Sequence, residues 1–112
     1  MKKDQSIYLL HIRDALLKII EFTANGRNAF FKDAKTQDAV IRNLEIIGEA
    51  AKNIHENFRD SNPQVAWKAV AGMRDKLIHD YFGVNLDIVW EVVEKEVPAL
   101  RQKIESLLKT AE

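Results

Sequence analysis

Apolar residues recur every three or four positions along most of the chain, which is the spacing that places side chains on one face of an α-helix. The first such stripe predicts a helix to about Ala24 that begins at Asp4 or Ser6, either of which can cap its N-terminus. Asn25-Gly26 is typical of a helix end. The stripe is wide, which favours contacts with more than one neighbour.

The chain after Gly26 predicts a link and then a second long helix. Residues 27–36 are expected to form an irregular loop that the Phe30-Phe31 pair holds to the core. Asp33 or Thr36 is then expected to cap a helix that runs to about Phe58. Its apolar series consists of Val40, Leu44, Ile47, Ala51, Ile54 and Phe58.

A turn and a shorter helical segment follow. Residues 59–63 predict the turn, and Pro63 suits the first position of a new helix because that position needs no backbone N–H. The segment is expected to run from Pro63 to about Tyr81, with Gly72 as the point at which it can break. Gly83 then ends it.

A last long helix is expected from Asn85, which caps it, to about Lys109. Pro98 lies inside this helix and is expected to bend it, because proline removes the hydrogen bond to the carbonyl of Glu94. These segments together predict an all-α fold, an antiparallel helical bundle of four to five helices in one domain covering residues 1–112. The wide apolar faces favour a homodimer.

Composition and charge narrow the classes of function. Lys plus Arg and Asp plus Glu number 17 each, so the zero net charge argues against non-specific wrapping of nucleic acid. A small RNA site needs only a local group of cations, for which Arg42, Lys68 and Lys76 are candidates. The chain has no cysteine, no signal-peptide pattern at its start and no apolar run of the ~20 residues that a membrane span needs. A cytoplasmic protein without membrane contact is therefore expected.

The stretch from Met73 to Gly83 carries more polar chemistry than a packing helix needs. Histidine can give and take a proton near neutral pH, and arginine carries a fixed charge in a fork that suits phosphate. His79 could move the proton of a 2′-hydroxyl or of a leaving group, while Arg74 holds the phosphate and stabilises its developing charge. Together they are the minimum for metal-free phosphodiester cleavage.

Helical geometry constrains this pair. Arg74 and His79 are five residues apart, so in an ideal helix they point about 140° away from each other. They can face one phosphate if the helix breaks near His79, if the arginine folds back, or if a second copy faces the first across a two-fold axis. The alternative is structural, with Arg74 paired to Asp75 or Glu45 and His79 capping the last turn.

Other polar and aromatic residues allow two interpretations each. Glu45 and Glu49 lie one turn apart and could brace Arg74 or shape a cleft, or else lie on a solvated face or in an ion pair. Trp67 and Trp90 could stack on bases, although anchoring a core or interface is the more common use of tryptophan. The histidines, including His11, which is expected at the surface, have no paired ligand spacing, so no metal site is predicted.

Arg74-x4-His79-x-Tyr81 resembles the RX4HXY signature of the HepT-like branch of HEPN-domain proteins. Residues 41–52, 65–73 and 81–90 resemble the same family, so the likeness covers essentially the whole chain. It implies a helical homodimer whose motifs meet in a cleft between protomers. It also implies a metal-independent ribonuclease toxin without a cofactor, in which Arg74 and His79 are catalytic and Asp75 supports them.

The resemblance further implies a type VII-like toxin–antitoxin pair acting on RNA such as tRNA or mRNA. The partner would be a nucleotidyltransferase antitoxin of the MNT type, which silences the toxin by adenylylating Tyr81. An added AMP would block the cleft and neutralise its cations. Two rival hypotheses are a non-catalytic helical module that docks a nucleotidyltransferase and a purely structural dimer.

Overall fold

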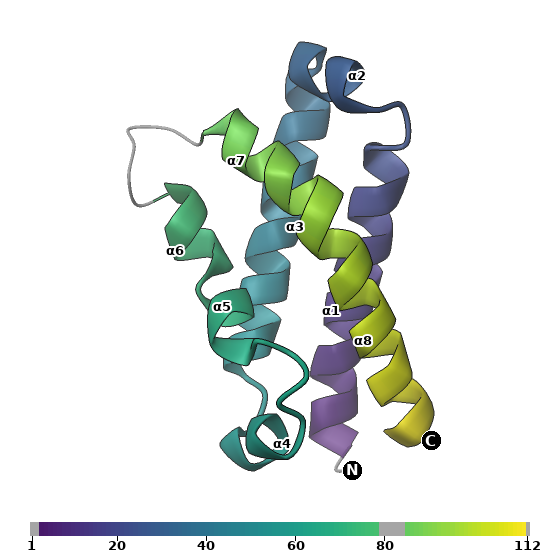
Figure 1. Cartoon of the computed structure of the whole chain (residues 1–112), viewed down its shortest axis with the longest axis vertical. Helices are drawn as coiled ribbons and strands as arrows, with labels where there is room; N and C mark the ends of the chain where they lie inside the picture. The colour runs from purple at the N-terminus through teal and green to yellow at the C-terminus, as the bar shows by residue number, and fades with distance from the viewer. Residues whose placement is uncertain (1–2, 79–84, 112) are drawn as a thin grey trace.

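The chain folds into helical segments that run alternately up and down the molecule (Figure 1). The computed structural model describes residues 3–78 and 85–111, and every regular element within those ranges is helical. The long elements are α1 (Lys3–Phe22), α3 (Ala34–Lys52) and the continuous run of α7 (Leu86–Glu91), η1 (Val92–Glu96) and α8 (Val97–Ala111). The short elements are α2 (Arg27–Lys32), α4 (Glu56–Ser61), α5 (Trp67–Ala71) and α6 (Met73–Ile78). The predicted all-α antiparallel bundle is confirmed.

Helix α1 forms one side of the core and packs along α3 and α8. Its apolar stripe is buried as the pattern predicted, and Leu9, Ile12 and Leu16 are each 0% exposed. The expected caps are wrong, because α1 already includes Lys3 and therefore contains both Asp4 and Ser6. Neither proline nor glycine interrupts the chain before them, so the helix can begin earlier.

Residues 27–36 are not the irregular loop that the sequence predicted, because Arg27–Lys32 form the short helix α2. Gly26 makes this turn with φ of 91°, a conformation that side chains rarely allow. Helix α2 places Phe30 in the core, 1% exposed, with its ring centroid 5.3 Å from that of Trp90 in α7. The expected attachment of this segment to the core is therefore confirmed, with a helix in place of a loop.

Asp33 caps α3, as one of the two predicted capping residues. Its carboxylate accepts a hydrogen bond from the Lys35 backbone N–H at 3.1 Å and another from the Thr36 hydroxyl at 2.8 Å. These bonds favour the ionised carboxylate, so the pKa of Asp33 is lowered below its usual value, chiefly by the Thr36 hydroxyl. The cap therefore depends on the charge of Asp33.

We expect the stabilisation from Asp33 to disappear in acid. A carboxyl group whose pKa is lowered by folding stabilises the folded state above its unfolded pKa, and this contribution is lost as the pH falls through the folded pKa. The difference in urea midpoint between the wild type and Asp33→Ala should therefore be constant from about pH 7 to about pH 5 and shrink at lower pH. A difference that stayed the same at the lowest pH would contradict a charge-dependent cap.

The second long helix ends earlier than predicted. Helix α3 stops at Lys52, and Ile54, 1% exposed, enters the core before α4 begins at Glu56. The imidazole Nδ1 of His55 accepts a hydrogen bond from the Asn57 backbone N–H at 3.4 Å and so starts a separate helix. The prediction of one helix to Phe58 fails because this local cap and the burial of Ile54 outweigh a continuous periodic pattern.

The third segment also starts later than Pro63, because α5 begins at Trp67. The indole Nε1 of Trp67 donates to the Asn62 carbonyl at 2.9 Å, which holds the intervening residues in a turn. The predicted break at Gly72 is confirmed, since α5 ends at Ala71 and α6 begins at Met73. The predicted helix end near Tyr81 and Gly83 lies outside the described residues.

The last segment begins as predicted, because the Asn85 side chain accepts from the N–H groups of Asp87 and Ile88 at 2.9 and 3.3 Å. Pro98 lies inside the last helical run as predicted, as the second residue of α8, and a π-helical turn, Val92–Glu96, immediately precedes α8. The Val97 N–H bonds the Val92 carbonyl in this wider turn. None of the helices described is long and apolar enough to cross a membrane.

Candidate functional site

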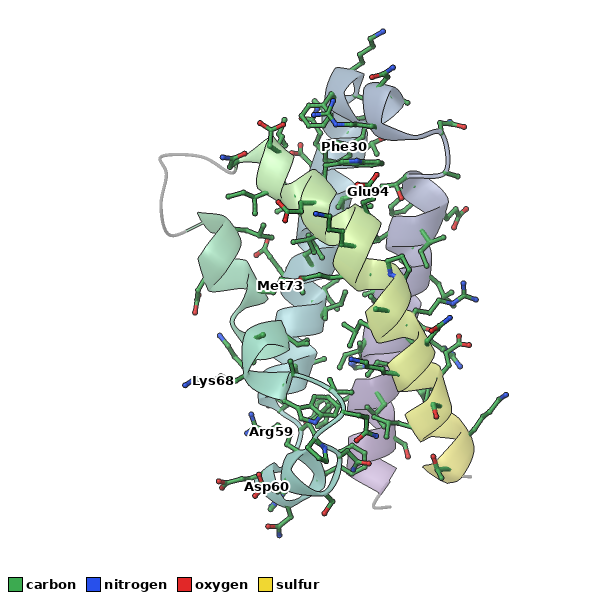
Figure 2. The ribbon with its side chains drawn as sticks, viewed as in Figure 1. Phe30, Arg59, Asp60, Lys68, Met73 and Glu94 are labelled. Atoms are coloured by element: carbon green, nitrogen blue, oxygen red, sulfur yellow. The ribbon has the colours of Figure 1, made fainter. Side chains whose placement is uncertain are left out.

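Helix α6 carries the first part of the Arg74–Tyr81 motif and packs on α3. Met73 and Leu77, 6% and 1% exposed, anchor α6, and Met73 points from α6 into the bundle in Figure 2. Asp75 lies in the first turn of α6, and its side chain is exposed to solvent. The chain therefore holds the start of the motif on a short helix with a buried face.

The remaining motif residues lie beyond what the structure describes. The backbone of Arg74 belongs to α6, but its side chain, and the whole of His79 and Tyr81, lie outside the described residues. The three arrangements that could bring Arg74 and His79 to one phosphate therefore remain predictions. The same holds for the structural pairing of Arg74 with Asp75 or Glu45.

The break at Gly72 sets the start of α6. The Gly72 N–H bonds the Lys68 carbonyl at 3.0 Å, which closes the last turn of α5. A Cβ atom at Gly72 would lie 3.3 Å from the same carbonyl oxygen, closer than most such contacts. Glycine therefore suits the tight junction from which the motif helix leaves α5.

The chain that follows the motif is held by α7. Asn85 caps α7, and Val89 is 0% exposed in the core. The guanidinium Nη2 of Arg27 lies 3.4 Å from a carboxylate oxygen of Asp87, and the Phe30–Trp90 contact joins the same two helices. Residues 79–84 are thus bracketed by two anchored helices, α6 before them and α7 after them.

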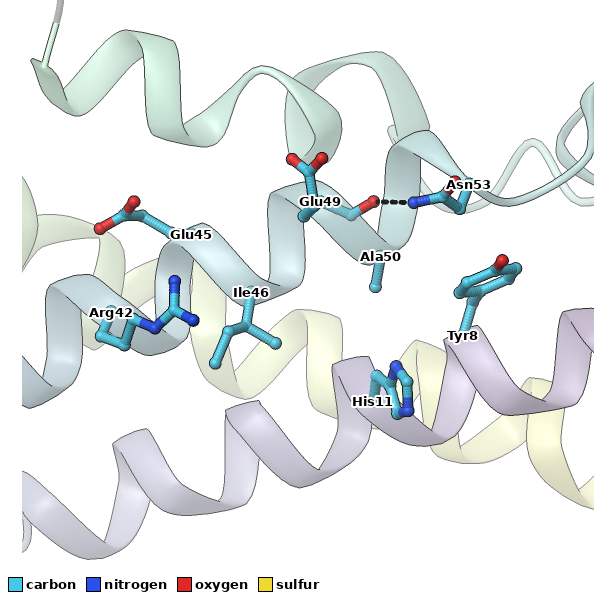
Figure 3. Close-up of a pocket in the computed structure, with 8 residues that line it drawn as sticks. All are labelled: Tyr8, His11, Arg42, Glu45, Ile46, Glu49, Ala50 and Asn53. Carbon is cyan, nitrogen blue, oxygen red and sulfur yellow. Dashed lines mark hydrogen bonds between the residues drawn. The ribbon is translucent and has the colours of Figure 1, made fainter.

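Helix α3 presents polar side chains beside α5 and α6. Glu49 is exposed, which agrees with the solvated alternative for that residue, while Glu45 is half-buried. Figure 3 shows both carboxylates projecting from the side of α3 nearer α5 and α6, while Arg42 lies nearer the groove between α3 and α1. The groove has a volume of about 400 Å³.

The tryptophans serve the core. Trp67 is 5% exposed, with its ring centroid 6.1 Å from that of Phe58, so its interpretation as a core anchor is confirmed. Trp90 is half-buried against Phe30, and its Nε1 is buried without a hydrogen-bond partner among the described residues. The burial of Trp67 leaves it unavailable for base stacking.

The structure describes the side chains of two of the three candidates for a local group of cations. Arg42 and Lys68 are exposed, and Lys68 points away from the bundle in Figure 2. The side chain of Lys76 lies outside the described residues. Among the side chains described, no group of three histidines or carboxylates is arranged to hold a metal ion.

The sequence did not identify one feature of this region. Tyr8 and His11 lie one turn apart on α1 and line the groove opposite Arg42, with their ring centroids 6.4 Å apart and their planes at 83°. His11 is exposed, as predicted. The three-residue spacing of Tyr8 and His11 indicates that they share one face of α1. The sequence alone did not show that this face lies against α3.

Known proteins resemble this chain over nearly all of its length. The profile of the family described as "Ribonuclease HepT-like" matches residues 12–107. A protein of Methanocaldococcus jannaschii that is named as a proposed RNase is 48% identical, with 99% of this chain and 93% of the relative covered. The "Probable ribonuclease HepT" of Thermococcus cleftensis is 47% identical, with 97% of this chain and 100% of the relative covered.

A solved structure shares the fold. It contains a tri-AMPylated HEPN toxin of Shewanella oneidensis in complex with an MNT antitoxin. The two chains are 26% identical with a TM-score of 0.67, and the alignment covers 100% of each. The resemblance to the HEPN fold that the sequence suggested is confirmed.

Proposed function

The chain belongs to the HepT-like ribonuclease family, and we propose that it is a metal-independent ribonuclease toxin controlled by an MNT-type nucleotidyltransferase. The observation that carries this proposal is the family match over residues 12–107, which includes the complete Arg74-x4-His79-x-Tyr81 motif. Relatives named as ribonucleases support the reaction class. A toxin that cleaves cellular RNA would act in the cytoplasm.

The proposed reaction is transesterification within the RNA strand. The 2′-oxygen of one nucleotide attacks the adjacent phosphorus, so a new P–O2′ bond forms while the P–O5′ bond breaks. His79 accepts the 2′-hydroxyl proton or donates a proton to the departing 5′-oxygen, and water exchanges the second proton. Arg74 binds the phosphate and stabilises its additional negative charge, with Asp75 as a supporting residue. The products are a 2′,3′-cyclic phosphate and a 5′-hydroxyl.

A homodimer is part of the proposal. The angle of about 140° between positions five residues apart in a helix favours a cleft in which motifs of two protomers face each other. Dimerisation would then complete the active site. A substitution that separates the protomers while preserving the helices should abolish cleavage, and a fully active monomer would refute this arrangement.

The cleavage reaction can be tested directly with purified protein and RNA in EDTA. The wild type should cut RNA without a metal ion, and Arg74→Ala should lower the cleavage rate by at least about a hundredfold, because it removes the main phosphate ligand. Arg101→Ala is the matched control, since Arg101 is an exposed arginine on α8. Wild-type protein that leaves RNA intact, or Arg74→Ala protein that cuts at the wild-type rate, would contradict the proposal.

Regulation through Tyr81 is the second part of the proposal. The Tyr81 hydroxyl oxygen would attack the α-phosphorus of ATP, forming a P–O bond to AMP while pyrophosphate leaves and the phenolic proton passes to a base. The AMPylated toxin and its MNT antitoxin in the related solved structure support this regulation. The modified residue would carry a bulky anion beside the proposed catalytic cations.

We expect Tyr81→Phe to escape this control. With an MNT-type enzyme and ATP, mass spectrometry should detect AMP addition to the wild type and no AMP at position 81 of the variant, because phenylalanine has no hydroxyl to modify. RNA cleavage by Tyr81→Phe should then remain active after treatment. Equal silencing of both proteins would contradict control through this residue.

The rival hypothesis is a non-catalytic module that docks the nucleotidyltransferase. The zero net charge gives it some support, because RNA binding needs local cations that offset the rest of the surface. It predicts a tight complex with the enzyme and no cleavage in EDTA. Cleavage of RNA by the wild-type protein in EDTA therefore separates the two hypotheses.

A further inference from the structure

The groove between α1 and α3 gathers side chains that the proposed cleavage chemistry does not use (Figure 3). Its volume of about 400 Å³ is within the range that holds small ligands, roughly 300–1,000 Å³. Ile46 and Ala50 of α3 provide apolar surface between the polar residues. Its lining therefore combines apolar, aromatic and charged groups, the combination found in ligand sites.

The α1 wall is aromatic. Tyr8 is half-buried and His11 is exposed, and their rings meet edge to face with centroids 6.4 Å apart. Both side chains project from α1 toward α3 in Figure 3. An exposed ring face supported by a second ring is a platform on which a nucleobase can stack.

The opposite wall has a cation at one end. Arg42 is exposed and makes no hydrogen bond or ion pair within the part of the chain that the structure describes. The half-buried Glu45 lies one turn from Arg42 on α3 and also lines the groove. A guanidinium with all its donors available is suited to a phosphate group.

The other end of the groove offers an acceptor. Asn53 donates its Nδ2 hydrogen to the Glu49 carbonyl at 2.9 Å, which leaves its side-chain oxygen to accept a bond. The Glu49 carboxylate itself projects toward α5 and α6, away from Tyr8 and His11 (Figure 3).

We infer that this groove binds one nucleotide, with its phosphate on Arg42 and its base against Tyr8 and His11. The inference rests on the proposed ribonuclease function, because it assigns the groove to a nucleotide of the RNA strand away from the cleaved bond. Helix α3, which forms one wall of the groove, also packs on α6. A free nucleoside monophosphate has the same chemistry and is the second source to be tested.

The binding test uses full-length protein carrying His79→Ala, so that the RNA stays intact. A fluorescein-labelled single-stranded RNA of about ten nucleotides is titrated by fluorescence anisotropy at several salt concentrations. Adding Arg42→Ala should weaken binding about tenfold and reduce the slope of log K against log salt by about 0.7, the value for one phosphate on single-stranded nucleic acid. Adding Arg101→Ala, an exposed arginine on α8, should change the affinity far less.

Tyr8→Leu tests the stacking contact while keeping apolar bulk beside the core. It should weaken binding about fivefold or more, because a stacked base contributes roughly 1–3 kcal/mol. Thermal melting followed by circular dichroism checks that the variant remains folded. GMP is added as the competitor in a separate titration, and displacement that depends on Arg42 assigns the groove to free nucleotides as well as to RNA.

The outcomes separate this inference from the proposed function. If protein with intact His79 cleaves RNA, but Arg42→Ala and Tyr8→Leu leave both KM and affinity unchanged, the groove assignment is wrong and the ribonuclease assignment stands. If RNA binding depends on Arg42 and no cleavage occurs, the groove assignment stands and the ribonuclease assignment is wrong. Light scattering that shows a dimer converted into monomers by Arg42→Ala would overturn the inference and assign this face to contact between copies.

Discussion

Replacing His79 with alanine is expected to lower kcat for RNA cleavage by about 10²–10⁴-fold, the usual contribution of a positioned general acid or base. Alanine can neither accept the 2′-hydroxyl proton nor donate one to the 5′-oxygen. Substrate affinity should change much less, because Arg74 supplies the phosphate contact in the proposed site. A gel assay with saturating labelled RNA in EDTA measures this rate.

Two comparisons make the result specific to proton transfer. Arg101→Ala should retain wild-type kcat, since its exposed side chain on α8 lies 3.7 Å from Glu105 and belongs to a surface ion pair. The His79→Ala protein should bind labelled RNA with nearly wild-type affinity. Unchanged kcat in this variant would exclude His79 as the acid or base, and a loss of affinity equal to the loss of rate would indicate a binding role.

The largest expected loss of stability follows from Phe30→Ala. Phe30 is 1% exposed and contacts the rings of both Phe31 and Trp90, each at a centroid distance of 5.3 Å. Removing a buried phenylalanine ring typically costs about 3–5 kcal/mol, because apolar contact is lost and a cavity remains. Domains of this kind are stable by only about 5–15 kcal/mol, so the variant should lie close to unfolding.

Urea unfolding measures this change through the transition midpoint at constant slope. Phe22→Ala is the matched control, because Phe22 is 40% exposed at the end of α1 and its loss should therefore cost clearly less, about 1–2 kcal/mol. We also expect the indole signal of Trp90 to shift in NMR spectra of Phe30→Ala at temperatures where it remains folded. A loss below about 1 kcal/mol would show that α2 contributes little to the core.

The elements that could be predicted from the sequence depend on local chemistry. Asp33 and Asn85 cap the helices that follow them, and Gly72 separates α5 from α6, because each residue acts within a few positions of itself. The apolar faces of the long helices were equally clear from their spacing. These features need no information about distant parts of the chain.

The errors arose where individual contacts outside the periodic pattern decide local structure. Helix α2 places Phe30 against Trp90, which is 60 residues away in the sequence. The late start of α5 accompanies the bond from Trp67 to the Asn62 carbonyl, and α3 ends where Ile54 enters the core. The apolar spacing continues through these helix ends, because the same apolar residues are buried whether the helix continues or stops.

In the candidate site, too, only the features formed by residues close in sequence could be predicted. Arg74, His79 and Tyr81 could be found because their residue types and spacing form a motif within one short stretch. The groove could not be found, because Tyr8 and Arg42 come to line one groove only through the packing of α1 against α3. A site whose residues lie close together in the sequence can be recognised from the sequence alone. The residues that pack around it are determined by the fold.

The π-helical turn at Val92–Glu96 has a consequence for the orientation of α7. A π-helical turn contains one more residue within each hydrogen-bonded ring than an α-helical turn does. Deleting one residue there could restore an ordinary α-helix, but it would rotate α7 by about 100° relative to α8. Asn85, at the start of α7, would then leave the bundle in another direction. The wide turn therefore acts as an angular spacer that sets how the chain after the motif re-enters the core.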